Sequence, residues 1–75
     1  MTPSEFFYIS PSGTAWQVRE HFRRTVSTFP TRDEAHSYAR NKASQLICSE
    51  IVILGPDGRR VYRELVELAP KEAGC

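Results

Sequence analysis

Long apolar runs are absent from this 75-residue chain. The longest, Ile51–Leu54, holds four residues, whereas a helix needs roughly 20 to span a bilayer. The first five residues, MTPSE, contain no lysine or arginine and no apolar segment, so we expect no secretory signal peptide. The composition therefore excludes a helical membrane protein and a membrane partner, and it favours a cytoplasmic location.

Cysteine and histidine are scarce, with two of each. Cys48 and Cys75 form neither a CxxC pair nor a framework of bridges, so we expect no disulfide and a buried Cys48. His21 and His36 lie fifteen positions apart, and neither has a cysteine at zinc-finger spacing. We therefore expect no metal site and two histidines at the surface.

Neither sign of charge dominates, because ten Lys and Arg residues face nine Asp and Glu residues, for a net charge of +1. This balance excludes a histone-like polycation and an acidic tail protein. The GxSxG, HExxH, GxxxxGK[ST] and GxGxxG motifs are all missing. A chain of this length also struggles to enclose a substrate pocket of a few hundred Å³. We therefore expect a protein that is not an enzyme, with no cofactor and no small-molecule substrate.

The sequence does contain segments whose side chains alternate between two faces, as is typical of strands. Residues 5–10 place Phe7 and Ile9 on one face and Phe6 and Tyr8 on the other. Residues 15–20 alternate in the same way and follow a glycine-containing turn, which predicts an antiparallel hairpin.

A second hairpin is predicted near the end of the chain. Residues 50–54 and 59–65 flank the segment Gly55-Pro-Asp-Gly58, whose residue types suit a tight turn. On the last strand we expect Val61 on one face and Tyr62 on the other. Two points stay open: the β-branched residues 25–29 could form a further strand, and the spacing within 64–69 also fits a helical turn.

The helix signal is the strongest in the chain. Thr31 and Glu34 form a capping box, in which each side chain can bond the backbone N–H of the other residue. The apolar positions that follow recur at helical spacing and are mostly alanine, so this helix can lie close to a sheet; they are Ala35, Tyr38, Ala39, Ala43 and Leu46.

The order β-β-(β)-α-β-β predicts an α+β fold of two layers, an antiparallel sheet with one helix packed on one face. The opposite face is then open or covered by a partner. We expect a single domain over residues 5–66, with flexible ends at 1–4 and 67–75.

Three segments together resemble a known family: Trp16-Gln-Val18, the run Thr31-Arg-Asp-Glu-Ala35-x-x-x-Ala39-Arg40, and Gly55-x-Asp57-Gly58-Arg59. They are similar to a small bacterial group called domain of unknown function 2188, and the likeness covers Phe7 to Val61. The resemblance implies a small α+β fold and brings no catalytic residue, cofactor or established partner. More distantly, the hairpin-then-helix order is similar to that of the YegP-like small proteins.

An open sheet face favours protein–protein interaction or self-association, through that face or through a strand edge. The candidate interaction face is Phe6, Tyr8 and Tyr62, because their strand neighbours Phe7, Ile9 and Val61 are better placed to fill the core. Alternatively, these side chains are half-buried beneath the apolar residues near the C-terminus, which are Leu65, Val66 and Leu68.

The alternative function is weak nucleic-acid binding. If the two hairpins are neighbours, arginines whose guanidinium groups can bind phosphate would form one stripe beside aromatic rings. The stripe comprises Arg19, Arg23, Arg24, Arg59, Arg60 and Arg63. The net charge of only +1 counts against this function. The arginines would otherwise be a solvated face paired with Glu20, Glu64 and Glu67.

Overall fold

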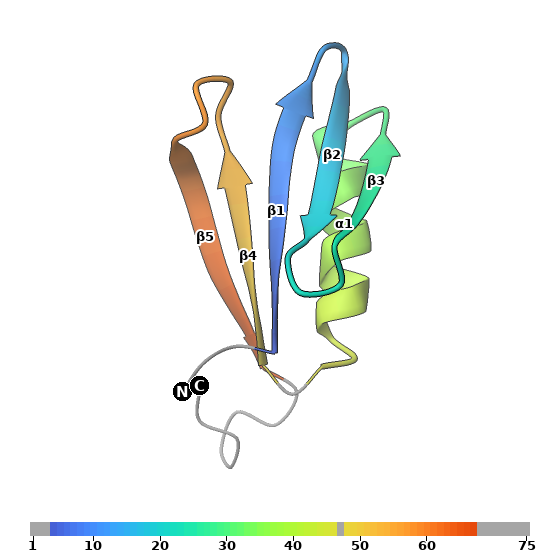
Figure 1. Cartoon of the computed structure of the whole chain (residues 1–75), viewed down its shortest axis with the longest axis vertical. Helices are drawn as coiled ribbons and strands as arrows, with labels where there is room; N and C mark the ends of the chain where they lie inside the picture. The colour runs from blue at the N-terminus through green and yellow to red at the C-terminus, as the bar shows by residue number, and fades with distance from the viewer. Residues whose placement is uncertain (1–3, 47, 68–75) are drawn as a thin grey trace.

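The structure is a computed structural model that describes residues 4–46 and 48–67. Five strands and one helix follow one another in these residues (Figure 1). Their bounds are β1 Glu5–Ser12, β2 Ala15–Glu20, β3 Thr25–Phe29, α1 Arg32–Ala43, β4 Cys48–Leu54 and β5 Arg60–Glu67. The segment 25–29, which the sequence left open, is therefore a strand.

The five strands form one sheet in the order β3-β2-β1-β4-β5. Three of the four pairings are antiparallel, as expected, but β1 and β4 run parallel to each other. The helix explains this difference, because it carries the chain back along the sheet before β4 begins, so β4 leaves from the same end as β1 (Figure 1). The sheet is therefore mixed, with β1 at its centre.

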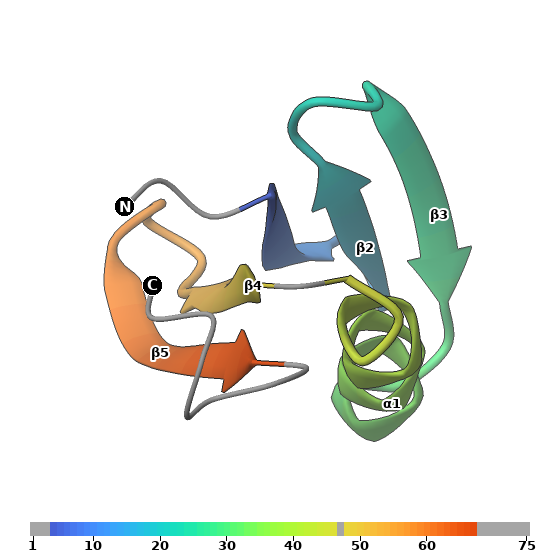
Figure 2. The same cartoon turned by 90° about the horizontal axis from the view of Figure 1, so that it is seen from below.

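The helix covers one face of the sheet (Figure 2), which confirms the predicted α+β architecture. Its contact row is Ala35, Ala39 and Ala43, and each is fully buried. These small side chains let α1 lie close to the strands, whose helix-facing core side chains are Phe7, Ile9, Val18, Ile51 and Ile53. The face that carries Phe7 and Ile9 is the one predicted from the alternation in β1.

The helix begins at the predicted cap. The backbone N–H of Glu34 donates to the Thr31 hydroxyl at 3.2 Å. The second half of the capping box differs from the expectation, because the Glu34 carboxylate accepts from the Thr31 hydroxyl at 3.3 Å instead of from its backbone N–H. Thr31 is thus the N-cap residue that fixes the start of α1.

The last strand resolves one open point and corrects one expectation. Residues 64–67 continue β5 and pair with the start of β4, so they form no helical turn; Leu68 and Ala69 lie outside the described residues. A register shift between Ile53 and Leu54 also interrupts the β4–β5 ladder. It leaves Val61, which we expected in the core, 64% exposed.

Both ends of the described chain join the sheet at Cys48. The Ser4 backbone N–H donates to the Cys48 carbonyl, and Glu67 pairs with Cys48 in the β4–β5 ladder. Cys48 is buried, as expected, but it is disulfide-bonded, so the expectation of no disulfide is wrong. The other cysteine lies outside the described residues, as do nearly all of the predicted flexible ends.

Within residues 4–46 and 48–67, no helix is long and apolar enough to cross a membrane.

Candidate functional site

The sheet face opposite the helix carries the candidate site, which we call the open face. A row of side chains crosses its middle: Arg19 on β2 is opposite Tyr8 on β1, Tyr8 is beside Val52 on β4, and Val52 is opposite Arg63 on β5. Because side chains alternate along a strand, these residues point away from the core that their neighbours fill. Tyr8 is half-buried at the centre of the row.

Four rings form an aromatic cluster at one end of this face: Phe6, Tyr8, His21 and Phe22. The Phe6 and Tyr8 rings lie 6.3 Å apart and nearly parallel, at 16°. His21 meets both rings edge-on, at 6.0 Å from Phe6 and 6.2 Å from Tyr8. Phe22 lies 5.9 Å from Phe6 and is 54% exposed. Two of the predicted interface residues, Phe6 and Tyr8, are thus brought together.

A buried carboxylate holds the loop that supplies half of this cluster. Glu5, only 2% exposed, accepts from the backbone N–H groups of Phe22 at 2.7 Å and Arg23 at 3.2 Å. Arg24 then takes a left-handed conformation, with φ of 58°, which closes the β2–β3 loop. Glu5 was not predicted as a site residue, since nothing in its local pattern links it to a loop seventeen residues away.

A hollow of about 450 Å³ lies on the open face beside the aromatic cluster. Tyr8, Ser10 and Arg19 line it from β1 and β2, and the β4–β5 turn closes the other side through Leu54 and Pro56. The volume falls within the range of about 300–1,000 Å³ that is typical of ligand sites. A hollow of this size was not expected in so short a chain.

The six predicted arginines are spread along the length of the sheet: Arg19 and Arg63 lie in the row across its middle, Arg59 and Arg60 next to the β4–β5 turn, and Arg23 and Arg24 in the β2–β3 loop. The turns of both hairpins lie at one end, and the β2–β3 loop, with Arg23 and Arg24, lies at the other (Figure 1). Arg60 pairs with Leu54, a residue that lines the hollow. The residues therefore form no continuous stripe along the hairpins.

Two of these arginines are already engaged in ion pairs. Arg63 binds Glu50 at 3.1 Å, and the exposed Arg59 lies 3.5 Å from Asp57. No ion pair is present at Arg19 or Arg60 within residues 4–46 and 48–67. These two are the open-face cations that remain available to a ligand.

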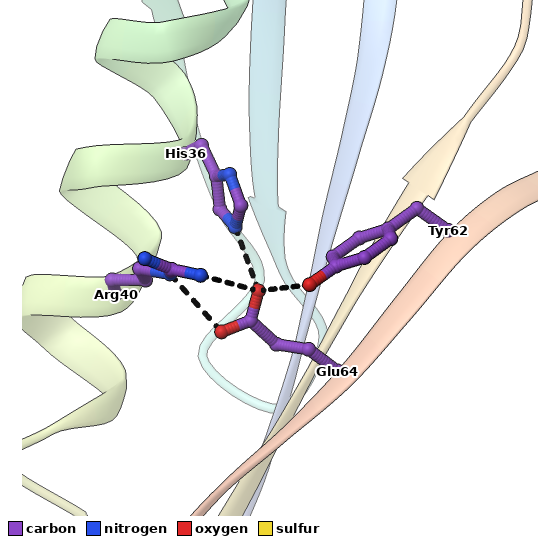
Figure 3. A network of polar contacts seen from close by, with 4 residues as sticks. All are labelled: His36, Arg40, Tyr62 and Glu64. Carbon is purple, nitrogen blue, oxygen red and sulfur yellow. Dashed lines mark hydrogen bonds and ion pairs between the residues drawn. The ribbon is translucent and has the colours of Figure 1, made fainter.

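The glutamates expected to neutralise the arginines lie elsewhere. Glu20 is buried on the helix side, where it accepts from the Tyr38 hydroxyl at 3.2 Å. Glu64 also points to the helix (Figure 3), and the side chain of Glu67 is not among those described. The predicted pairing of these arginines with Glu20 and Glu64 therefore does not occur, and the ion pair of Arg63 is with Glu50.

Tyr62 does not share a face with Phe6 and Tyr8. It is opposite the core residue Ile53, and its ring lies 6.0 Å from that of His36 on α1. The register shift after Ile53 explains why counting along the strand misplaced its neighbour Val61. The open-face cluster therefore lacks Tyr62 of β5, which was predicted to belong to it, and also contains His21 and Phe22 of the β2–β3 loop, which were not predicted.

On the helix side, Tyr62 belongs to a polar network centred on Glu64 (Figure 3). The Glu64 carboxylate accepts from Arg40 at 3.0 and 3.2 Å and from the Tyr62 hydroxyl at 3.1 Å, and His36 Nε2 lies 2.9 Å away. The network ties edge strand β5 to α1. It was not predicted, since Arg40 and Glu64 are 24 residues apart.

The network holds Glu64 ionised. Burial of the carboxyl raises its pKa, but the hydrogen bonds from Arg40, His36 and Tyr62 outweigh this effect, and the resulting pKa lies below the ordinary value. The hydrogen bond and charge of Glu64 in turn raise the pKa of Arg40. A carboxylate saturated by donors is a poor proton acceptor, so its role is to hold β5 in place.

Among the described residues, no group of three His, Cys, Asp or Glu side chains is close enough to hold a metal ion. A family model described as an uncharacterised protein conserved in bacteria, DUF2188, matches residues 7–61. No curated protein and no solved structure matches the chain at a significant level.

Proposed function

The chain belongs to the DUF2188 family, whose description names no activity, and we propose that it is a non-catalytic module that binds nucleic acid through its open face. This was the alternative function in the sequence analysis, and the arrangement of charges now favours it. The more distant similarity to the YegP-like proteins stays a prediction.

The observation that carries the proposal is the separation of charge by the sheet. Glu20 and Glu64 are held on the helix side by Tyr38, His36 and Arg40. The open face carries Arg19, Arg60 and Arg63, and Glu50 is the acid placed there by the register. A net charge of +1 for the whole chain therefore conceals a cationic face beside aromatic rings, the combination that binds phosphate and bases.

Salt-dependent binding tests the proposal. We expect a fluorescently labelled oligonucleotide to bind at low salt and its affinity to fall steeply as salt rises, because bound arginines release counterions. Arg19→Ala and Arg60→Ala should each weaken binding and lower the slope of log affinity against log salt by about 0.7–0.9.

The matched control for these variants is Arg32→Ala. Arg32 is an exposed arginine in the first turn of α1, on the other side of the molecule. Its replacement removes the same charge and should leave the affinity nearly unchanged. Absence of binding at low salt, or equal losses from Arg32→Ala and Arg19→Ala, would contradict the proposal.

A second candidate function is protein binding, with another copy of the chain as the first partner to test. Phe22, Val26 and Leu65 support it, since these open-face apolar side chains are 51–54% exposed. Self-association predicts a molar mass that rises with concentration and persists in high salt and in reductant. A chain that stays monomeric at high concentration under those conditions would eliminate the homodimer.

A cytoplasmic location stays a prediction. The disulfide at Cys48 argues against it, because disulfides persist mainly in oxidising compartments.

A further inference from the structure

We infer that the nucleic acid bound on the open face is single-stranded and that one of its bases stacks on Tyr8 in the hollow. The inference rests on the proposed function and adds the strand form and the contact residues to it. In this arrangement Tyr8 receives the base, and Arg19 receives the adjoining phosphate.

The position of Tyr8 supports stacking of an unpaired base on its ring. Its side chain is half-buried, lines the hollow of about 450 Å³, and contacts the rings of Phe6 and His21, neither of which lines the hollow. A ring supported in this way is fixed before a ligand arrives, so stacking costs little conformational entropy. The bases of a duplex are already stacked and paired, whereas an unpaired base has a free π-face to offer.

Arg19 is placed to bind the phosphate next to the stacked base. It is directly opposite Tyr8 in the β1–β2 ladder and lines the same hollow. Arg63, on the other side of Tyr8, is engaged by Glu50 at 3.1 Å, but Arg19 has no ion pair in the part of the chain that the structure describes. A guanidinium beside an aromatic ring matches the phosphate and base of a single nucleotide.

The β2–β3 loop extends this surface through Phe22, whose ring lies 5.9 Å from that of Phe6. Glu5 fixes the backbone of Phe22 and Arg23 next to Phe6. A strand that runs along β1 from the hollow would therefore meet the Tyr8 ring, then the Phe6 ring, and then the exposed Phe22 ring of the β2–β3 loop. This order of contacts follows the length of β1 and suits a flexible chain of successive bases and phosphates.

The test compares two single strands of about twelve nucleotides, one intact and one with abasic positions throughout its middle. Both carry the same phosphates, so they differ only in the bases available for stacking. At low salt we expect the intact strand to bind at least about fivefold more tightly than the abasic strand, and more tightly than a duplex of equal length.

Variants of Tyr8 then test whether a base of the strand stacks on this ring. Tyr8→Leu keeps an apolar side chain but removes the π-face, and should remove most of the preference for the intact strand, whereas Tyr8→Trp should retain it. The matched control is Tyr62→Leu, which alters an exposed tyrosine on the helix side and should leave the preference unchanged. A 2-aminopurine base in the strand reports stacking directly, through quenching that Tyr8→Leu abolishes.

The outcomes separate this inference from the function on which it rests. Equal binding of the intact and abasic strands, tighter binding of the duplex, or an unchanged preference in Tyr8→Leu would overturn the inference, while salt-dependent binding would still support the proposed function. No binding of any oligonucleotide would overturn both and leave a protein partner. If Tyr8→Leu fails to fold, the comparison of strands on the unaltered protein decides the question.

Discussion

Replacing Ala39 by leucine tests the packing on which the open face depends. Ala39 is fully buried at the centre of the alanine row between α1 and the sheet, and leucine adds three carbon atoms to this contact. Overpacking of this kind costs about 1–3 kcal/mol, and a central position should place the loss near the top of that range, about 2–3 kcal/mol. For a domain of this size the melting temperature should fall by about 10–20 °C.

Thermal and urea unfolding followed by far-ultraviolet circular dichroism measure the loss. The matched control is Ser37→Leu, which introduces the same side chain at an exposed position of the same helix and should change stability by less than about 0.5 kcal/mol. Equal losses from the two variants would mean that α1 is rotated about its axis. A stabilised Ala39→Leu variant would mean that the helix and the sheet are not in close contact.

Three further changes have defined expectations. Thr31→Ala removes the acceptor for the Glu34 backbone N–H and should lower the free energy of unfolding by about 1 kcal/mol, measured by urea denaturation. Glu5→Gln exchanges a buried carboxylate that accepts three backbone N–H groups for an amide, and should cost about 1.5–3 kcal/mol in the same assay and speed hydrogen exchange in the β2–β3 loop. Glu64 has a lowered pKa in the folded state, so its contribution is present above its ordinary value of 4.5 and is lost as the pH falls through the lower folded value. The difference in stability between the protein and Glu64→Gln should therefore shrink as the pH falls below 4.5.

Local patterns predicted most of the fold. The capping box located the start of α1, the alanine spacing identified its buried face, and alternation in β1 separated Phe7 and Ile9 from Phe6 and Tyr8. Each of these features depends on residues within a few positions of one another. The parallel pairing of β1 and β4 was not predictable in this way, because it depends on where the helix returns the chain.

The site was predicted less completely, for reasons that lie in particular residues. Phe6 and Tyr8 were assigned to the correct face by alternation, but Tyr62 was assigned to the wrong face, because its pairing with the core residue Ile53 is not visible in the spacing along β5. Phe22 joined the cluster through a loop whose shape depends on the distant carboxylate of Glu5. Spacing alone does not reveal contacts of that kind.

The charge of the open face follows from the register of β2, which the core fixes. Val18 is fully buried and paired with Ile9, so Arg19 is opposite Tyr8 and Glu20 is buried on the helix side. A shift of this strand by one residue would exchange the two faces, placing Glu20 beside Tyr8 and Arg19 in the core. Burial of Val18 therefore determines whether the aromatic cluster has a cation or an anion beside it. Summing charges along the chain cannot detect this, because the sum is the same in either register.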